Sequence, residues 1–254
     1  MIRAVLFDYG DTLVEGTRPD DEIMQAALEK AFRVFKRNGL EMDSAAFAER
    51  DREVFSRYAE IEAAEKRDIP DLLKCRELAG LVLAKLPPMK RAMVATEANA
   101  AFWNQVAGCY RLRTGAVSSL RRLKAMGRLM AIISNHHDGG ALRRHLVDLK
   151  ISPYFSGVLA SSELHYRKPD SRIFRLCAAM LSVDPSESVF VGDSPVNDIV
   201  GAKRAGMLTI MMLNSSQAPN HGGSTAAEPD YAVSDLREVP EIVKRVNHAA
   251  SVCP

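Results

Sequence analysis

Cysteine is scarce in this sequence, and the few cysteines present do not stand in a metal-binding spacing. The chain of 254 residues holds four of them: Cys75, Cys109, Cys177 and Cys253. With no Cys-x-x-Cys pair and no matching histidine spacing, neither a structural zinc site nor a disulfide framework is expected. Such sparse cysteine is typical of a protein in a reducing compartment, and we expect a cytoplasmic location.

Long apolar runs and a strong excess of one charge are also missing. The apolar run near the N-terminus is interrupted at Asp8, far too early for a signal peptide or a membrane span. The formal net charge is +2, with 26% charged and 47% hydrophobic residues, which is ordinary for a folded globular protein. No nucleic-acid or membrane partner is therefore expected. The oligomeric state remains open.

Short apolar runs recur along the chain and indicate strands buried on both faces. They are Ala4–Phe7, Leu129–Ile133, Gly157–Ala160, Val189–Val191, Leu208–Leu213 and Tyr231–Val233. Apolar residues at helical spacing separate most of these runs, as Val117, Leu120 and Leu123 do before Gly127. This alternation predicts βαβ units and an α/β fold with a Rossmann-like parallel sheet flanked by helices.

The stretch from Arg18 to Gly108 differs, because it contains helical patterns but no convincing strand. Its amphipathic patterns are closed by helix-ending signals such as Asn38-Gly39 and Pro87-Pro88. We therefore expect an α/β core of residues 1–16 and 110–254, with an inserted α-helical cap of residues 17–109. The segment Ser215–Pro229, rich in Ser, Gly, Pro and Asn, is expected to be a mobile loop.

Acidic side chains follow two of the expected strands. The group Asp8–Thr12 comes directly after the first strand, and Gly192–Asp198 comes at the end of Val189–Val191. Because parallel strands end at a common edge of the sheet, ligand sites gather there. Carboxylates in such a place suit a nucleophile or oxygen ligands to Mg²⁺. For the first group, a turn in which Asp11 only caps the backbone is the simpler alternative.

Two further polar groups fall near strand ends. Ser134-Asn135 ends the strand Leu129–Ile133, where hydroxyl and N–H groups can donate to a phosphate oxygen or merely cap the next helix. Lys168, directly before Pro169, can hold a fixed positive charge over an anion, although alone it reads as a surface lysine. The pair His136-His137 is a weak metal signal, and a structural role is expected for it.

In their fixed order, these four groups make the chain resemble the haloacid dehalogenase superfamily over nearly its whole length. The motifs of that family are an Asp-x-Asp-x-Thr strand end, a strand ending in Ser or Thr, a Lys, and Gly-Asp-x-x-x-x-Asp. They match Asp8–Thr12, Ser134, Lys168 and Gly192–Asp198. The helical stretch resembles the cap that the family inserts after its first motif. The resemblance thus implies a haloacid dehalogenase-like core with an inserted cap.

The resemblance also implies a chemistry. In such enzymes the first Asp attacks phosphorus and becomes an aspartyl-phosphate, which water then hydrolyses. This makes Asp8 the expected nucleophile of a Mg²⁺-dependent hydrolase acting on a small phosphorylated metabolite. The expected metal site comprises Asp8, the main-chain carbonyl of Gly10, Asp193 and, in support, Asp198. The side chains expected around the phosphate are Thr12, Ser134, Asn135 and the neutralising Lys168.

One position departs from the family pattern. Phosphatases of the family usually carry a second Asp two positions after the nucleophile, where it protonates the leaving group and then activates water. Here that position is Gly10, and the next acid is Asp11. We expect Asp11 to take over this role, helped by the flexibility of Gly10, unless the leaving group needs little protonation. The candidate catalytic residues are therefore Asp8, Asp11 and Lys168.

Two other functions remain open. A 2-haloacid dehalogenase also uses the strand-end Asp, but it needs neither Mg²⁺ nor the acidic fourth motif. It also carries a Tyr two residues after the nucleophile, which is absent here. A catalytically silent binding or regulatory protein has the support of Gly10 alone. The substrate cannot be read from the sequence, although Glu15 and Arg18 near the entry to the cap are candidates for specificity.

Overall fold

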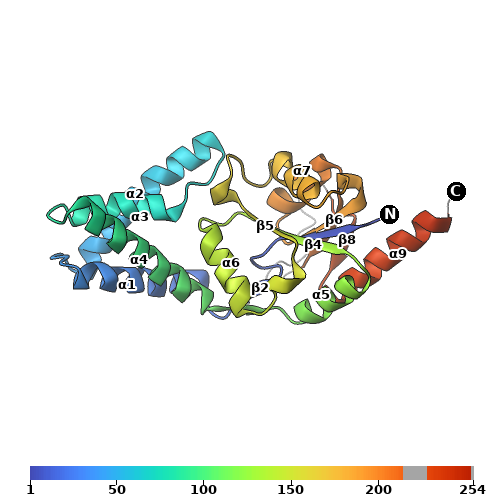
Figure 1. The fold of residues 1–254 in the computed structure, drawn as a ribbon, viewed down its shortest axis with the longest axis horizontal. Helices are drawn as coiled ribbons and strands as arrows, with labels where there is room; N and C mark the ends of the chain where they lie inside the picture. The colour runs from blue at the N-terminus through green and yellow to red at the C-terminus, as the bar shows by residue number, and fades with distance from the viewer. Residues whose placement is uncertain (214–227, 253–254) are drawn as a thin grey trace.

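The computed structural model describes residues 1–213 and 228–252, and a parallel sheet forms the centre of this part of the chain (Figure 1). Its strands are hydrogen-bonded in the order β5-β4-β1-β6-β7-β8, all parallel. The bounds are β1 Ala4–Phe7, β4 Leu129–Ser134, β5 Gly157–Ala160, β6 Ser188–Gly192, β7 Leu208–Met212 and β8 Tyr231–Val233. The predicted α/β fold is confirmed, and each expected apolar run forms a strand.

Helices cover both faces of this sheet. On one face, Val5 and Phe7 of β1 share a core with Leu120 and Leu142. The helices there are α5 Ala116–Ala125, α6 Gly139–Asp148 and α9 Val239–Val252. On the other face, Leu6 packs in a core with α7 Ser171–Met180 and α8 Gly201–Ala205. Because both faces are covered, the strands are apolar throughout rather than alternating, which is why the sequence revealed them.

A helical region lies to one side of the sheet and gives the molecule its elongated shape (Figure 1). Its helices are α1 Asp20–Arg37, α2 Ser44–Glu65, α3 Asp71–Val82 and α4 Pro88–Ala107. They enclose a hydrophobic core of their own, which includes Phe35, Phe47, Leu78 and Val94. The predicted helical insertion is confirmed. Its exact boundaries, 17–109, remain a prediction.

A short antiparallel ribbon joins the helical region to the sheet. Strand β2, Val14–Gly16, pairs with β3, Tyr110–Leu112, so that Val14 lies opposite Leu112 and Gly16 opposite Tyr110. This ribbon was not predicted, because a run of three residues is too short to show a strand period. Both connections between the helical region and the sheet therefore run side by side and are hydrogen-bonded to each other.

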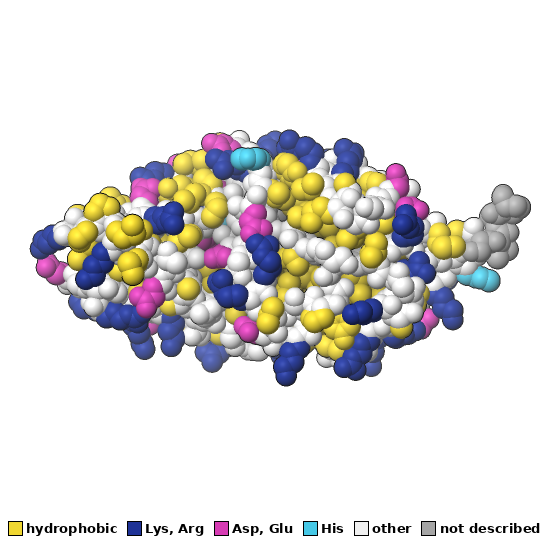
Figure 2. Space-filling view, in the orientation of Figure 1, with side chains coloured by type: hydrophobic (Ala, Val, Ile, Leu, Met, Phe, Trp, Pro, Cys, Tyr) yellow, Lys and Arg dark blue, Asp and Glu magenta, His cyan; other side chains and the backbone are white. Residues whose placement is uncertain are grey.

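On the face seen in Figure 2, Lys and Arg side chains are spread over the surface, with fewer Asp and Glu side chains between them. None of the described helices is both long and apolar enough to span a membrane. Three cysteines, Cys75, Cys109 and Cys177, are free and buried. The loop expected at Ser215–Pro229 lies almost wholly outside the described residues.

Candidate active site

Three neighbouring strands deliver the motif residues to one edge of the sheet. Phe7, the last residue of β1, pairs with Ile132 of β4 and with Val191 of β6. Asp8 therefore leaves the sheet between Ser134 and the residues that follow β6, and its N–H donates to the carbonyl of Val191 at 2.8 Å. The geometry thus brings together the first, second and fourth sequence groups.

Lys168 completes the group from a loop before α7. Its Nζ lies 2.5 Å from Oδ1 of Asp8 and 2.7 Å from Oδ1 of Asp198, and the residue is only 3% exposed. Burial alone would lower the pKa of Lys168, but the Asp198 and Asp8 carboxylates outweigh it and raise the pKa above its ordinary value. The ammonium is therefore charged, and it bridges the expected nucleophile and Asp198.

The acidic side chains fit a divalent cation. One carboxylate oxygen from each of Asp8, Asp193 and Asp198 lies within 4.8 Å of the others. Burial raises the pKa of Asp8 to about 6, with Lys168 opposing the rise and Asp198 adding to it. Burial and the charges of Asp8 and Asp198 raise the pKa of Asp193 to about 7. Three carboxylates against one ammonium leave an excess of negative charge that a hard, oxygen-binding cation such as Mg²⁺ would neutralise.

The turn after β6 aims Asp198 into this cluster. Ser194 caps the π-helical segment Pro195–Val200, its Oγ accepting from the N–H of Asn197 at 3.1 Å. The N–H of Ser194 donates to Oδ2 of Asp198 at 2.9 Å, which fixes a carboxylate that is almost fully buried. The Asp198 side chain also crosses close to Gly192, where a Cβ would lie 2.5 Å from the Asp198 Cγ.

Replacing Gly192 by Ala is expected to lower the free energy of unfolding by about 1–3 kcal/mol, the usual cost of overpacking a buried site. The added methyl group must displace Asp198, which Lys168 and Ser194 hold in place. Denaturant unfolding of the metal-free protein measures the effect. Gly80→Ala is the matched control, since a Cβ there meets no heavy atom within 4 Å. Equal stability of the two variants would contradict this close approach.

The expected phosphate-binding residues surround Asp8, but they are not equivalent. Thr12 is fully buried, and its hydroxyl donates to Oδ2 of Asp8 at 3.3 Å. Ser134 is buried at the end of β4. Asn135 instead holds the Lys168 main chain: its Oδ1 accepts from the Lys168 N–H at 2.9 Å, and its Nδ2 donates to the Lys168 carbonyl at 3.0 Å. The geometry gives Asn135 a positioning role, and its contact with phosphate remains a prediction.

Gly10 occupies the position at which phosphatases of the resembled family usually carry a second Asp, and Asp11 follows it. A Cβ at Gly10 would find no heavy atom within 4 Å, so the missing side chain leaves open space. Asp11 is exposed and has a left-handed φ of 52°. The carboxyl is partly buried by its neighbours although the residue is exposed, and this partial burial and the nearby Asp20 raise its pKa, while Arg113 opposes the rise. Its acid–base role remains a prediction.

A cavity of about 210 Å³ opens beside Gly10, between the sheet edge and the helical region. Its lining includes Tyr9, Gly10, Met24, Trp103, Ser134 and His136. Sequence reasoning did not find the helical residues among these, because helical periodicity does not show which side chain faces the cleft. The residues it named lie elsewhere: Glu15 pairs with Arg111 at 3.0 Å, and Arg18 borders a separate hollow over α1.

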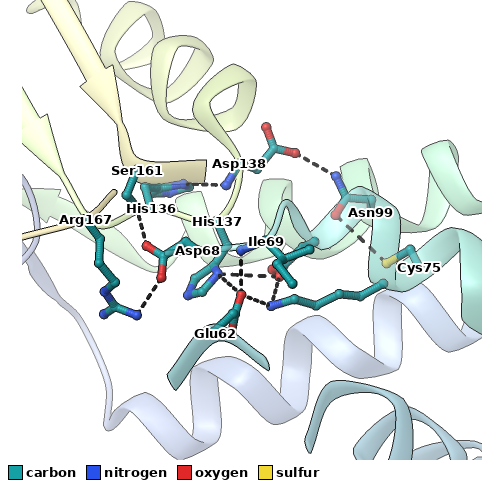
Figure 3. Close-up of polar contacts among 12 residues, drawn as sticks. Glu62, Asp68, Ile69, Cys75, Asn99, His136, His137, Asp138, Ser161 and Arg167 are labelled. Atoms are coloured by element: carbon teal, nitrogen blue, oxygen red, sulfur yellow. Dashed lines mark hydrogen bonds and ion pairs between the residues drawn. The ribbon is translucent and has the colours of Figure 1, made fainter. Parts of the chain in front are cut away.

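A polar cluster also ties the helical region to the core (Figure 3). Lys74 is buried, and its Nζ lies 2.9 Å from Glu62 and 3.1 Å from Asp71. The Asp71 N–H donates to the carbonyl of His137 at 3.1 Å, so the loop after β4 contacts α3 directly. The oxygens of Glu62 and Asp68 lie near a nitrogen of His137. Lys74 pairs with Glu62 and Asp71, so these side chains and the His137 loop form a polar contact between the helical region and the core.

A second part of the same contact involves Asp68, whose side chain is fully buried. Its carboxylate accepts from the Ser161 hydroxyl and, at 2.5 Å, from Nη1 of Arg167 (Figure 3). Arg167 directly precedes Lys168 in the chain. The helical region therefore touches the loop that carries the catalytic lysine candidate.

Comparison with known proteins identifies the family. A model of haloacid dehalogenase-like hydrolases matches residues 2–206, and the chain belongs to this family. A glyceraldehyde 3-phosphate phosphatase of Methanopyrus kandleri is 26% identical over 248 residues, 97% of this chain and 99% of that protein. A phosphoserine phosphatase of Thermus thermophilus is 33% identical over 130 residues, 51% of this chain and 50% of that one. The predicted family and enzyme class, a hydrolase with phosphatase relatives, are thus confirmed.

A solved structure adds a different relative. The 2-haloacid dehalogenase of Pseudomonas syringae superposes with a TM-score of 0.75 at 25% identity, covering 97% of this chain and 100% of that one. The family therefore includes similar proteins of both chemistries, and the choice between them depends on the residues of the site.

Proposed function

We propose that this protein is a Mg²⁺-dependent phosphatase that hydrolyses a small phosphorylated metabolite through attack by Asp8 on phosphorus. The observation that carries the proposal is the charged cluster, in which Lys168 bridges Asp8 and Asp198 and three carboxylates gather within 4.8 Å. A site that displaces halide from carbon has no need of this excess of acidic oxygens. The similarity of the whole chain to a phosphatase supports the same choice.

The geometry prepares Asp8 for attack. Lys168 holds Oδ1, and the Thr12 hydroxyl contacts Oδ2, so the carboxylate has a fixed orientation. In the first step a bond forms from an Asp8 oxygen to phosphorus, and the bond from phosphorus to the ester oxygen breaks. Water then attacks phosphorus, which releases phosphate and restores the carboxylate. Mg²⁺ bound by the acidic side chains would offset the phosphate charge, and Lys168 adds a fixed positive charge from this chain.

The leaving alkoxide needs a proton, and we assign this task to Asp11. Its raised pKa favours a protonated carboxyl, and Asp11 lies close enough to contribute to the raised pKa of Asp193. The space beside Gly10 is open, so this turn has room to bring the Asp11 side chain towards the substrate.

Asp11→Asn is then expected to slow hydrolysis of alkyl phosphates more than that of p-nitrophenyl phosphate, whose leaving group needs little protonation.

Restoring the family acid should raise activity. Gly10→Asp is expected to increase kcat/KM for an alkyl phosphate by up to about 10²-fold, the lower end of general acid–base catalysis. The added side chain enters open space. Steady-state kinetics on glycerol phosphate and p-nitrophenyl phosphate measure the change, with Gly10→Asn as a control of equal size that carries no acid. An equal effect of both substitutions would contradict the argument.

The proposed function is tested by phosphate release from p-nitrophenyl phosphate in the presence of Mg²⁺ and of EDTA. Hydrolysis that requires Mg²⁺ is the expected result. The likeness to a 2-haloacid dehalogenase and the missing acid at Gly10 favour that chemistry as the second candidate. Release of chloride from 2-chloropropionate without metal, and no release of phosphate, would overturn the proposal. A protein that does neither would fit the silent binding role.

A further inference from the structure

The cavity beside Gly10 is lined by uncharged side chains. Among the described residues that line it there is no Lys, Arg, Asp or Glu. Met24, Val106 and Ala141 contribute apolar surface, and Tyr9 and Trp103 contribute aromatic rings. Its volume, about 210 Å³, lies below the roughly 300–1,000 Å³ typical of pockets for drug-sized ligands. The cavity therefore suits a small, uncharged group.

The two histidines of the lining do not supply a positive charge. The Nδ1 of His136 accepts from the N–H of Asp138 at 3.0 Å, which requires a lone pair on that nitrogen. Burial also lowers the pKa of His136 to about 4, although the charge of Asp138 acts to raise it. His145 shares its Nδ1 with the hydroxyl of Tyr9, and burial lowers its pKa as well. The His136 ring is therefore neutral, and burial favours the neutral form of His145 as well.

Trp103 forms part of the wall of the same cavity. Its ring packs against His136, with centroids 4.4 Å apart and planes inclined by 37°. Its Nε1 is buried and has no hydrogen-bond partner within the described parts of the chain. Trp103 therefore contributes aromatic surface to the cavity wall.

We propose that this cavity receives the alcohol part of the phosphate ester and selects uncharged leaving groups of a few carbon atoms. The inference rests on the proposed phosphatase function. A leaving group with a carboxylate would lose its hydration without gaining a cation, and it would lie near Asp8 and Asp11. Esters such as glyceraldehyde 3-phosphate fit the cavity, whereas phosphorylated carboxylic acids do not.

A matched pair of substrates tests the selection. Glyceraldehyde 3-phosphate and 3-phosphoglycerate share a three-carbon frame and differ in the aldehyde and the carboxylate. We expect kcat/KM to be at least about 10²-fold higher for glyceraldehyde 3-phosphate than for 3-phosphoglycerate. A site that offers no partner to a charged group disfavours that group by a factor of this order. If kcat/KM were equal for the two substrates while Mg²⁺-dependent hydrolysis of p-nitrophenyl phosphate remained, the proposed selection of uncharged leaving groups would be wrong and the phosphatase function would stand. No hydrolysis of any of the three would overturn the proposed function and the selection with it.

A positively charged side chain placed in the cavity should weaken the preference for glyceraldehyde 3-phosphate over 3-phosphoglycerate. Met24 lines the cavity and is 39% exposed, so Met24→Lys can be accommodated. The preference for the aldehyde is expected to fall at least about 10-fold in this variant, since a new opposite charge pairs with the carboxylate. Met93→Lys is the matched control, because Met93 is 65% exposed on α4 outside the cavity lining. Identical preferences in both variants would overturn the proposal.

Discussion

Asp8→Asn is expected to abolish hydrolysis of p-nitrophenyl phosphate, with kcat reduced by about 10⁴-fold or more, as when a covalent nucleophile is removed. The amide matches the carboxylate in size but is a far weaker nucleophile. Lys168 keeps its contact with Asp198 at 2.7 Å, so the loop before α7 remains anchored. Rates measured with saturating Mg²⁺ give the size of the loss. Activity close to that of the unmodified enzyme would place the nucleophile elsewhere.

The same substitution should not unfold the protein. Burial raises the pKa of Asp8 from its ordinary 3.8 to about 6. A carboxyl whose pKa is higher in the folded chain favours folding only while protonated, and this contribution is lost as the pH rises through about 6. At pH 8, without metal, Asp8→Asn is therefore expected to be at least as stable as the parent. Thermal unfolding separates this outcome from an activity loss caused by misfolding.

Lys168→Met is expected to reduce both stability and activity. It leaves Asp8 and Asp198 buried side by side without their shared ammonium. Breaking a buried ion pair in this way typically lowers the free energy of unfolding by about 3–5 kcal/mol. Since we propose that Lys168 also opposes the charge of the phosphate, kcat should fall by about 10²–10³-fold. Denaturant unfolding in metal-free buffer and steady-state kinetics measure the two effects.

A surface lysine provides the control for this variant. Lys203 pairs with Asp230 at 2.9 Å, and about a third of each side chain is exposed. Lys203→Met should change the free energy of unfolding by less than about 1 kcal/mol, because exposed ion pairs contribute little. Mg²⁺ should restore part of the stability of Lys168→Met, since the cation binds the carboxylates left unbalanced. If the two lysine variants were equally stable, the buried bridge would not be a major stabilising contact.

The sheet and the positions of its polar residues were predictable from local sequence. Strand β1 is buried on both faces, so its residues form a continuous apolar run that ends at Asp8, and β6 leads to Asp193 in the same way. Parallel strands place their carboxyl ends together, which is enough to predict that these acids meet. The order of the motifs then identified Lys168, although nothing local marks that residue as buried.

What was missed depends on contacts between distant segments. The pairing of Val14 with Leu112 joins parts of the chain that no periodicity links. The engagement of Asn135 with the Lys168 backbone depends on how two loops pack, and so does the cavity wall formed by Trp103. Side-chain periodicity gives the face of a helix but not the partner of that face. Residues that act across the interface are therefore visible only in the folded structure.

The Asp68–Arg167 ion pair has a consequence for how the helical region can move. Arg167 and Lys168 are joined by one peptide bond, so the helical region is connected, through Asp68, to the residue that balances Asp8. Any movement that lifts α2 and α3 away must break this pair or carry Arg167 along with it. Lys168 itself keeps its contacts with the Asn135 side chain and with Asp198, because none of these involves the helical region. The Asp68–Arg167 pair therefore couples the position of the helical region to the loop before α7, while the Lys168 ammonium is held from the core alone.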